Sequence, residues 1–315
     1  MRRFNKIKKL FNESIKIIDD SILINKKEVQ KIDEDVPNFI EDKLDKLTDK
    51  MSNFYDEIKF PNYDDLEDYA SLYDKGRKQI FTRKLDEELS YSSNILELGC
   101  GTGQLSLFLA RGNREICGVD ISDSSLRMGE KFRKENNIEN VYFMKMDVFD
   151  LKFKDNSFDF IISNGVLHHT KDAKEAFKKL VKVLKPGGII VIGLYHKYGR
   201  TVTRIKQLLA KLFSQRIQIF DRKSRNIKSK EKRNAWVRDQ FLNPHETLHT
   251  PKEVLRWFDE SEIEFMNLIP HFDIKKNKVI KQNLLPNLSR LNEILLAFNS
   301  TQIEEGGFFI IIGKK

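Results

Sequence analysis

Short apolar runs alternate with stretches of helical periodicity through the middle of this chain. The apolar runs have the length of buried strands, and the segments between them repeat apolar residues at three- and four-residue spacing. This alternation is typical of βαβ units, in which helices cover both faces of a parallel sheet. We expect strands at Ile95–Leu98, Ile116–Val119, Val141–Met144, Phe158–Ile162 and Ile189–Leu194, with helices at Gln104–Arg111, Ser124–Asn136 and Ala173–Leu184.

The alternation stops after Tyr195 and resumes near residue 250. A helix is predicted at Pro251–Asp259, and strands at Ile263–Leu268 and Phe308–Ile312. The expected fold class is therefore α/β, a doubly wound sheet of seven mostly parallel strands. We divide the chain into an N-terminal helical extension (1–90), a core (91–195), an insertion that forms a lid over the substrate (196–250) and a C-terminal segment that completes the sheet (251–315).

The N-terminal extension also has a regular apolar pattern. Its apolar residues recur at the spacing of one helix face, which predicts an amphipathic helix. Arg2, Arg3 and nearby lysines would let such a helix lie on a membrane surface, although such a helix more often packs on its own protein or on a partner subunit. The residues of this stripe are Phe4, Ile7, Phe11, Ile15, Ile18 and Ile22, and one or two further helices are predicted between Tyr63 and Leu89.

Length and composition agree with a globular protein. The 315 residues suffice for one large domain with attachments or for two modest domains. No apolar run approaches the ~20 residues of a membrane-spanning helix, and polar residues interrupt any N-terminal signal sequence. Cys100 and Cys117 show no metal or redox spacing. We therefore expect a cytoplasmic protein with no transmembrane segment, and the oligomeric state stays open.

The net charge of +9 is concentrated in one segment. From Lys197 to Arg233 there are thirteen Lys or Arg residues and only two acids. Such a segment can attract phosphates or anionic lipid, or it can simply be a solvated insertion. Its apolar residues Ile205, Leu208, Leu209, Leu212 and Phe213 recur at helical spacing, so part of it should form an amphipathic helix.

The most informative stretch joins the first strand of the core to the first helix. The strand Ile95–Leu98 runs into Gly99-Cys100-Gly101-Thr102-Gly103. Glycines are needed there because the chain turns sharply and because a ligand must approach the backbone. In the dinucleotide-binding version of this turn, the third glycine stands where this chain has Gln104. The spacing therefore favours a nucleoside ligand without a pyrophosphate.

Two acids strengthen this interpretation. Asp120 ends the second strand, about twenty residues beyond the glycines, where a carboxylate accepts hydrogen bonds from ribose hydroxyls. Asp147 follows the third strand, where it could accept from an adenine amino group. A single such acid is often only a helix cap. Three matched positions at the carboxyl ends of successive strands indicate a ligand site.

Read together, these residues resemble the class I S-adenosylmethionine-dependent methyltransferases, which have a Rossmann-like fold. The likeness continues through 158–169 and the Leu184-Lys185-Pro186-Gly187-Gly188 turn, a feature of the branch that modifies small molecules. The resemblance implies S-adenosylmethionine as cofactor and a final antiparallel strand at Phe308–Ile312. It implies that Glu97, Gly99, Gly101 and Gly103 line the methionine part, that Asp120, Ile121, Asp147 and Val148 hold the adenosine, and that Asn164 and Leu167 flank the sulfonium.

The run His245-Glu246-Thr247-Leu248-His249 matches a zinc-protease motif in its letters. That chemistry needs both histidines on one helix face. Thr250, Pro251 and Glu253 instead form a helix-start signature, so a helix begins after His249. We therefore expect no metal, and these residues become candidates for a polar substrate loop or an anchor of the insertion.

The reaction expected from the resemblance is transfer of a methyl group to a small-molecule acceptor. If the acceptor must lose a proton, a base is required, and histidine suits neutral pH. Each candidate also has a purely structural explanation, such as helix capping or packing. RNA or tRNA methylation by the basic insertion, and a non-catalytic scaffold that binds the cofactor, are the alternatives. The candidate bases, in order, are His169, His168, His245, His249 and Tyr195.

Overall fold

The computed structural model describes most of the chain. The described residues are 2–18, 21–25, 27–31, 36–41, 43–58, 63, 66–201, 203–205, 207–208, 227, 229–269, 279–280 and 307–315. The predicted helix face that begins at Ile205 falls largely outside them, because 209–226 are not described. Among the described residues, no helix has the length and apolar character needed to cross a membrane.

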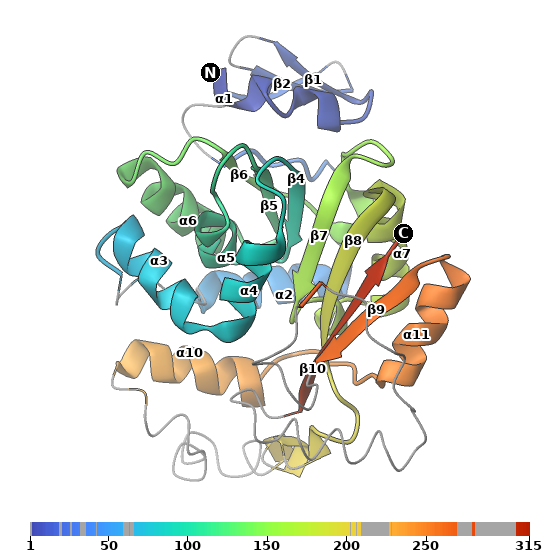
Figure 1. Ribbon diagram of the computed structural model, residues 1–315. Helices are drawn as coiled ribbons and strands as arrows, with labels where there is room; N and C mark the ends of the chain where they lie inside the picture. Colours follow the sequence, from blue (N-terminus) through green and yellow to red (C-terminus); the bar gives the residue numbers. More distant parts are fainter. Residues whose placement is uncertain are drawn as a thin grey trace.

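A seven-stranded sheet forms the centre of the molecule (Figure 1). Its strand order is β6-β5-β4-β7-β8-β10-β9. Strand β10 runs antiparallel to both of its neighbours, whereas the pairs from β6 to β8 are parallel. The strands are β4 (Asn94–Leu98), β5 (Glu115–Asp120), β6 (Val141–Lys145), β7 (Phe158–Asn164), β8 (Leu184–Tyr195), β9 (Glu264–Ile269) and β10 (Phe308–Lys314). The expected fold class, including the antiparallel last strand, is confirmed.

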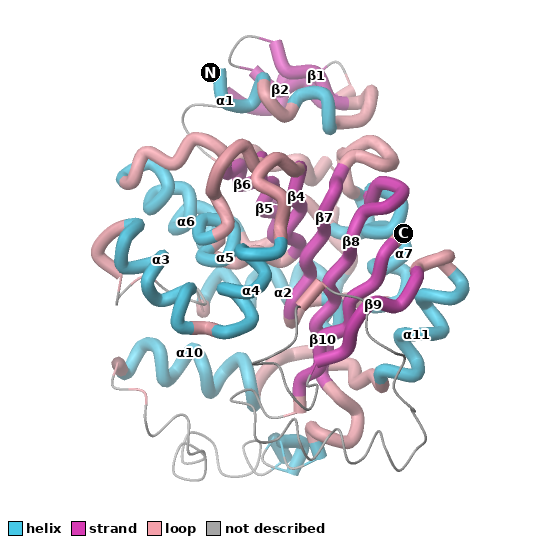
Figure 2. Tube along the Cα trace, viewed as in Figure 1, coloured by secondary structure: helices cyan, strands magenta, loops and turns pink. Residues whose placement is uncertain are grey.

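Alternate residues of the strands are buried on opposite faces of the sheet. Leu96 and Leu98 of β4 join one apolar cluster, and Ile95 joins the other. This period of two, with both faces apolar, is what a sheet covered on both sides requires. Helices flank the strands on both sides (Figure 2). The first cluster contains α7 (Ala173–Val183) and α11 (Pro251–Glu260), and the second contains α3 (Tyr69–Lys78), α4 (Ile80–Glu88), α5 (Gln104–Phe108) and α6 (Asp123–Glu135).

Side-chain caps fix where several helices begin. Ser122 accepts a hydrogen bond from the Ser125 amide at the start of α6, and Asp172 accepts from the Glu175 amide at the start of α7. Thr250 caps α11 in the same way, with Pro251 in the first turn. The predicted helix start after His249 is therefore confirmed. The short 3-10 turns are η1 (Lys8–Leu10), η2 (Val148–Asp150) and η3 (Leu167–His169).

The prediction of an amphipathic helix from Phe4 to Ile22 is wrong. The segment forms a short helix α1 (Arg2–Asn5), η1 and a three-stranded sheet of β1 (Ile15–Ile18), β2 (Ser21–Ile24) and β3 (Lys27–Lys31). The Asn12 side chain accepts hydrogen bonds from the amide and hydroxyl of Ser14, which turns the chain before β1. The isoleucines that follow are β-branched and favour strands. The apolar residues from Phe4 to Ile22 have helical spacing along the sequence, although they belong to several short strands and turns.

Two further helices of the described structure contact each other. Helix α2 (Lys46–Glu57) begins at Asp45, whose carboxylate accepts from the amides of Leu47 and Thr48. Helix α10 (Lys230–Phe241) follows the basic segment and lies on the side of the molecule opposite β1 and β2 (Figure 1). Arg238 of α10 contacts Glu57 of α2 at 2.5 Å, so the two helices meet.

Candidate active site

A cavity of about 470 Å³ lies at the carboxyl ends of the central strands. Parallel sheets bind their ligands there, because loops and helix N-termini converge at that edge. The lining residues come from the carboxyl ends of β4 to β8 and the loops after them, from the helices α2 to α6 and α10, and from Phe308 of β10. Ten predicted site residues line it: Glu97, Gly99, Gly101, Asp120, Ile121, Asp147, Val148, Asn164, His169 and Tyr195.

The turn after β4 requires glycine for two physical reasons. Gly99 has a φ of 69°, which is in the left-handed region, and a Cβ there would collide with the Val166 side chain. Gly103 has a φ of 77°, and a Cβ there would collide with the ring of Phe143. The turn therefore brings bare backbone to the cavity wall and starts α5 without strain.

Three carboxylates face the cavity near this turn. Asp120 accepts from the Gly101 amide at 2.7 Å and from the Ser122 amide at 2.8 Å, so each carboxylate oxygen is oriented by one backbone N–H. Glu97 accepts from the Ser106 hydroxyl at 2.5 Å, and burial raises the pKa of Glu97 to about 7. Asp147 accepts from the Phe149 amide at 3.0 Å. Each carboxylate keeps lone pairs for a ligand.

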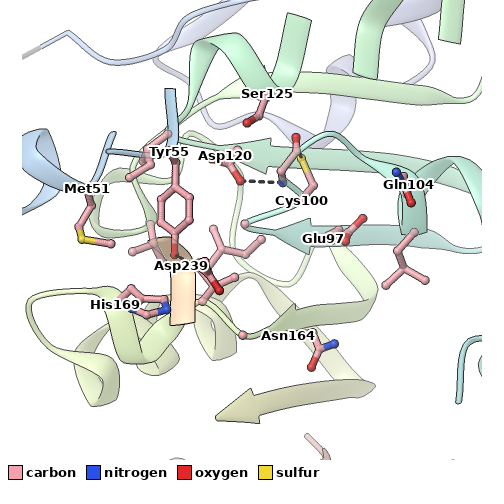
Figure 3. A pocket seen from close by; sticks show the side chains of 18 of the residues that line it. Met51, Tyr55, Glu97, Cys100, Gln104, Asp120, Ser125, Asn164, His169 and Asp239 are labelled. Atoms are coloured by element: carbon pink, nitrogen blue, oxygen red, sulfur yellow. Dashed lines mark hydrogen bonds between the residues drawn. The ribbon is translucent and has the colours of Figure 1, made fainter. Parts of the chain in front are cut away.

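A second polar group lies at the other end of the cavity. Figure 3 shows the Tyr55 hydroxyl pointing at Asp239, with His169 beside them. The hydroxyl donates to Asp239 Oδ1 at 3.1 Å, and Asn243 Nδ2 donates to the same hydroxyl at 3.0 Å. Gln240 Nε2 bridges Asp239 Oδ2 and the Tyr195 hydroxyl, each at 2.9 Å. Helices α2 and α10 thus bring polar side chains to the residues that follow β7 and β8.

His169 has a defined tautomer. Its Nδ1 lies 2.6 Å from the His245 carbonyl oxygen. Because a carbonyl oxygen only accepts hydrogen bonds, Nδ1 carries the proton and Nε2 is left with a lone pair. Burial lowers the pKa of His169, and this effect outweighs the opposing charge of Asp239. The side chain is therefore neutral at pH 7 and able to accept a proton.

Five predicted site residues lie outside the cavity lining. Leu167 is fully buried in the core, and Gly165 and Val166 face the cavity in its place. His168 is also fully buried, with its ring 4.1 Å from that of Tyr195, and burial holds its pKa well below the usual range. The other three residues outside the lining are Gly103, His245 and His249.

The loop that carries His245 and His249 anchors the insertion to the core. The Thr247 amide donates to the His168 carbonyl at 2.8 Å, and the His249 amide donates to the Tyr195 carbonyl at 3.0 Å. The His249 ring contacts Glu253 at 3.0 Å. The two histidines therefore do not share a helix face, as predicted. Within the described part of the chain, no group of three or more His, Cys, Asp or Glu residues could hold a metal ion.

The residues that sequence reasoning missed come from α2 and α10. Tyr55, Trp236, Asp239 and Gln240 all line the cavity. The sequence contained no clear signal for this helix, because its apolar residues Trp236, Val237 and Phe241 do not place Asp239 on a common face with them. No signal in the sequence paired this helix with α2.

A family model described as a methyltransferase domain matches residues 89–262 of the chain. The chain belongs to this family. The matched residues include every element from β4 to α11. They also include most of the residues that line the cavity. The protein is thus a class I methyltransferase, and its cofactor is S-adenosylmethionine.

Individual relatives agree with this assignment. The methyltransferase is 28% identical over 211 residues to demethylmenaquinone methyltransferase of Staphylococcus aureus, a match that covers 65% of this chain and 81% of that enzyme. It is 26% identical over 197 residues to an uncharacterized protein of Synechococcus sp., and that match covers 55% of this chain and 47% of the relative. The chain thus spans about half the length of the cyanobacterial protein.

Solved structures show the same fold at low sequence identity. Geranyl diphosphate C-methyltransferase from Streptomyces coelicolor, solved with S-adenosyl-L-homocysteine, superimposes with a TM-score of 0.50 and 12% identity. The alignment covers 86% of this chain and 99% of that enzyme. The protein PKMT2 from Rickettsia typhi superimposes with a TM-score of 0.52 and 16% identity, over 74% of this chain and 52% of that protein.

The polar groups around the β4 turn fit S-adenosylmethionine. The methyltransferase offers a backbone without side chains at Gly99, a buried carboxylate at Glu97 and an oriented carboxylate at Asp120. An amino acid group with an ammonium, followed by a ribose with two hydroxyls, matches these hydrogen-bond acceptors. When bound, the cofactor supplies a methyl group activated by a positive sulfur.

Proposed function

We propose that this methyltransferase transfers the methyl group to a small-molecule acceptor bound between Tyr55, His169, Tyr195 and Asp239. The observation that carries the proposal is the position of helices α2 and α10. They supply Tyr55 and Asp239 to the same cavity that Glu97 and Asp120 line. A cavity of about 470 Å³ has room for a small molecule next to a cofactor. The relative from Staphylococcus aureus is named for a small-molecule acceptor, demethylmenaquinone.

The cofactor would occupy the end of the cavity near β4 and β5. Glu97 and the turn of Gly99 and Gly101 would hold the methionine part, and Asp120 with Ile121 the ribose. Asp147 and Val148 would contact the adenine. Asn164 is the last residue of β7 and lines the same cavity, and it would border the sulfonium. The two buried cysteines are unpaired, which fits the reducing conditions of the cytoplasm.

The protein contributes alignment, exclusion of water and a base. In the reaction the acceptor atom forms a bond to the methyl carbon while the bond between that carbon and sulfur breaks. A hydroxyl or amine acceptor also loses a proton. His169 is the base that we propose, because Nε2 has a free lone pair and the ring is neutral. Burial and the charge of Asp239 raise the pKa values of Tyr55 and Tyr195, so neither phenol competes as a base.

The test is methyl transfer from labelled S-adenosylmethionine to fractions of a cell extract. We expect label in a low-molecular-weight fraction, and His169→Gln should lower kcat by at least about a hundredfold while S-adenosylhomocysteine still binds. His168→Gln is the comparison for a neighbouring histidine outside the cavity. Label in the RNA fraction would replace the small-molecule acceptor with a nucleic acid. No label in any fraction, with S-adenosylhomocysteine bound, would support the scaffold alternative.

A further inference from the structure

The acceptor end of the cavity contains a buried carboxylate without a cationic partner. Asp239 is 9% exposed, and its hydrogen-bond donors among the described residues are the neutral side chains of Tyr55 and Gln240. In the part of the chain that the structure describes, no Lys or Arg forms an ion pair with Asp239. Two arginines lie close to Asp239 in the sequence or in the hydrogen-bond network, and each forms its ion pair with another acid. Arg238 pairs with Glu57 at 2.5 Å. Arg200 pairs with Glu246 at 2.6 Å and also donates to Gln240 at 2.7 Å.

A buried carboxylate of this kind is costly to maintain. Removal from water penalises the charge, and neutral hydrogen bonds offset only part of the penalty. A carboxylate offers about four acceptor positions, and Asp239 uses two of them. The remaining positions are available to a ligand in the cavity that Asp239 lines.

Aromatic rings surround the same end of the cavity. Tyr55 and Tyr195 are each linked to Asp239 by the hydrogen bonds described above, and Trp236 precedes Asp239 by one turn of α10. All three line the cavity. The faces of aromatic rings attract cations, and the attraction is strongest where water is excluded.

Among the described residues that line the cavity, the Lys or Arg side chain is that of Lys75, and it lies at the end away from Asp239. Lys75 of α3 donates to Gln104 of α5 at 3.3 Å, and Gln104 lies across the cavity from Asp239 (Figure 3). Arg200 lies over the Tyr195 ring, with Cζ 3.6 Å from the centroid, and does not line the cavity. Arg200 is paired with Glu246, so among the residues that line the acceptor end the charged side chain is Asp239.

We propose that Asp239, Tyr55, Tyr195 and Trp236 bind a positively charged group of the acceptor, so that the substrate is an organic cation such as a protonated amine. This inference rests on the proposed function and specifies its substrate class. The charged group anchors the acceptor, and the atom that receives the methyl group lies nearer Asn164 and His169. Asn243 holds the Tyr55 hydroxyl as a donor to Asp239, which orients the carboxylate.

The first experiment compares two probes that differ in charge. Thermal unfolding of the enzyme loaded with S-adenosylhomocysteine is measured with phenethylamine and with 2-phenylethanol at equal concentration, at pH 7. We expect the amine to raise Tm more than the alcohol does. Asp239→Asn should abolish this difference, whereas Glu139→Gln, which removes an exposed carboxylate outside the cavity lining, should retain it. Equal shifts for both probes, or a larger shift with the alcohol, would overturn the proposal.

The second experiment uses the labelled small molecule from the methyl-transfer assay. On a cation-exchange column at pH 7 the labelled product should be retained. With that acceptor, Asp239→Asn should raise KM by about tenfold or more, the loss expected for one charge-assisted hydrogen bond. S-adenosylhomocysteine binding should not change. Glu135→Gln removes an exposed carboxylate outside the cavity lining and should leave KM as it is.

The outcomes separate the two proposals. A labelled small molecule that passes through the column would sink the cationic substrate and leave small-molecule methylation intact. Label in RNA alone would sink the proposed function, and the probe comparison would still decide whether the Asp239 end binds cations.

Discussion

The side chain of Glu97 in the cavity is a buried carboxyl group. Glu97 is 8% exposed, and its carboxylate accepts hydrogen bonds from the hydroxyl and the backbone of Ser106. Desolvation outweighs these hydrogen bonds, so the pKa of Glu97 rises from 4.5 to about 7. In the folded protein without ligand, the Glu97 carboxyl therefore keeps its proton to a higher pH than an exposed glutamate does. The ammonium group of a ligand bound next to Glu97 would stabilise the ionised carboxylate and lower its pKa.

This balance predicts how Glu97→Gln changes stability. The pKa of Glu97 is higher in the folded than in the unfolded chain, so its cost to folding grows as pH rises from about 4.5 to about 7. The variant without ligand should therefore be more stable than the parent at pH 8, by roughly 1 to 3 kcal/mol, and should match it near pH 4.5. Urea unfolding at both pH values measures this. Binding of S-adenosylmethionine by the variant should be weaker.

Glu139→Gln is the control, because its side chain is 70% exposed. It should change neither stability nor cofactor affinity. Equal stability of parent and Glu97→Gln at pH 8 would contradict the raised pKa.

A pH profile tests the role of His169. Burial lowers the pKa of its ring below 6.5, so the neutral form persists at pH 7 and is lost only as the pH falls below that range. We expect kcat to be level across neutral pH and to fall on the acid side with a pKa below 6.5. His169→Gln should lose this acid limb along with most of kcat. A limb above pH 7 in the parent would point to a different base.

At the scale of elements, caps and turns decide where side chains point. The Thr250 hydroxyl accepts from the Glu253 amide at 3.2 Å, and Pro251 stands in the first turn of α11. This start keeps His249 out of the helix and leaves its amide to bond with the Tyr195 carbonyl. Because of this cap, His245 and His249 do not lie on one helix. The cap also leaves His249 in a position where its amide hydrogen-bonds to the end of β8.

Thr250→Ala should lower the free energy of unfolding by about 1 kcal/mol, the usual cost of a lost N-cap. Urea denaturation measures it. Thr250→Ser keeps the hydroxyl and should restore most of the loss. If alanine and serine destabilised equally, the hydroxyl would not be the cap.

At the scale of the whole molecule, the N-terminal segment is part of the core. Phe11 stacks between Phe39 and Phe153, with ring centroids 5.4 and 5.3 Å away. Phe4 meets Tyr142 of β6 edge-on at 5.4 Å. These side chains belong to the same apolar cluster as α7 and α11. The segment thus covers sheet surface that would otherwise be exposed, far from the residues that line the cavity.

Phe11→Ala should therefore destabilise the protein by about 3 kcal/mol or more, because a fully buried aromatic ring is removed. Affinity for S-adenosylhomocysteine should not change. Ile18→Ala is the matched control, since Ile18 is 51% exposed in the same segment. Thermal unfolding and calorimetry measure the two effects. A Phe11→Ala protein as stable as the parent would show that the segment contributes little to the core.

The sequence alone determined the core sheet and the cofactor end of the cavity. All seven strands of that sheet were predicted, because each carries its own apolar period and its own turn or cap. Gly99, Glu97 and Asp120 could be identified because they are fixed by their position after a strand, within one local motif. Whether the residues predicted to hold the cofactor do so remains to be tested by their variants.

Only the tertiary structure decided the acceptor end and the N-terminal sheet. Tyr55 and Asp239 are 184 positions apart, and their hydrogen bond exists because α2 and α10 pack against each other. No local period encodes that pairing. In the N-terminal segment, the apolar spacing fitted a helix and a set of short strands equally well, and packing on the core favoured the strands. Local patterns fix elements, whereas contacts between distant segments are fixed by the packing of the whole chain.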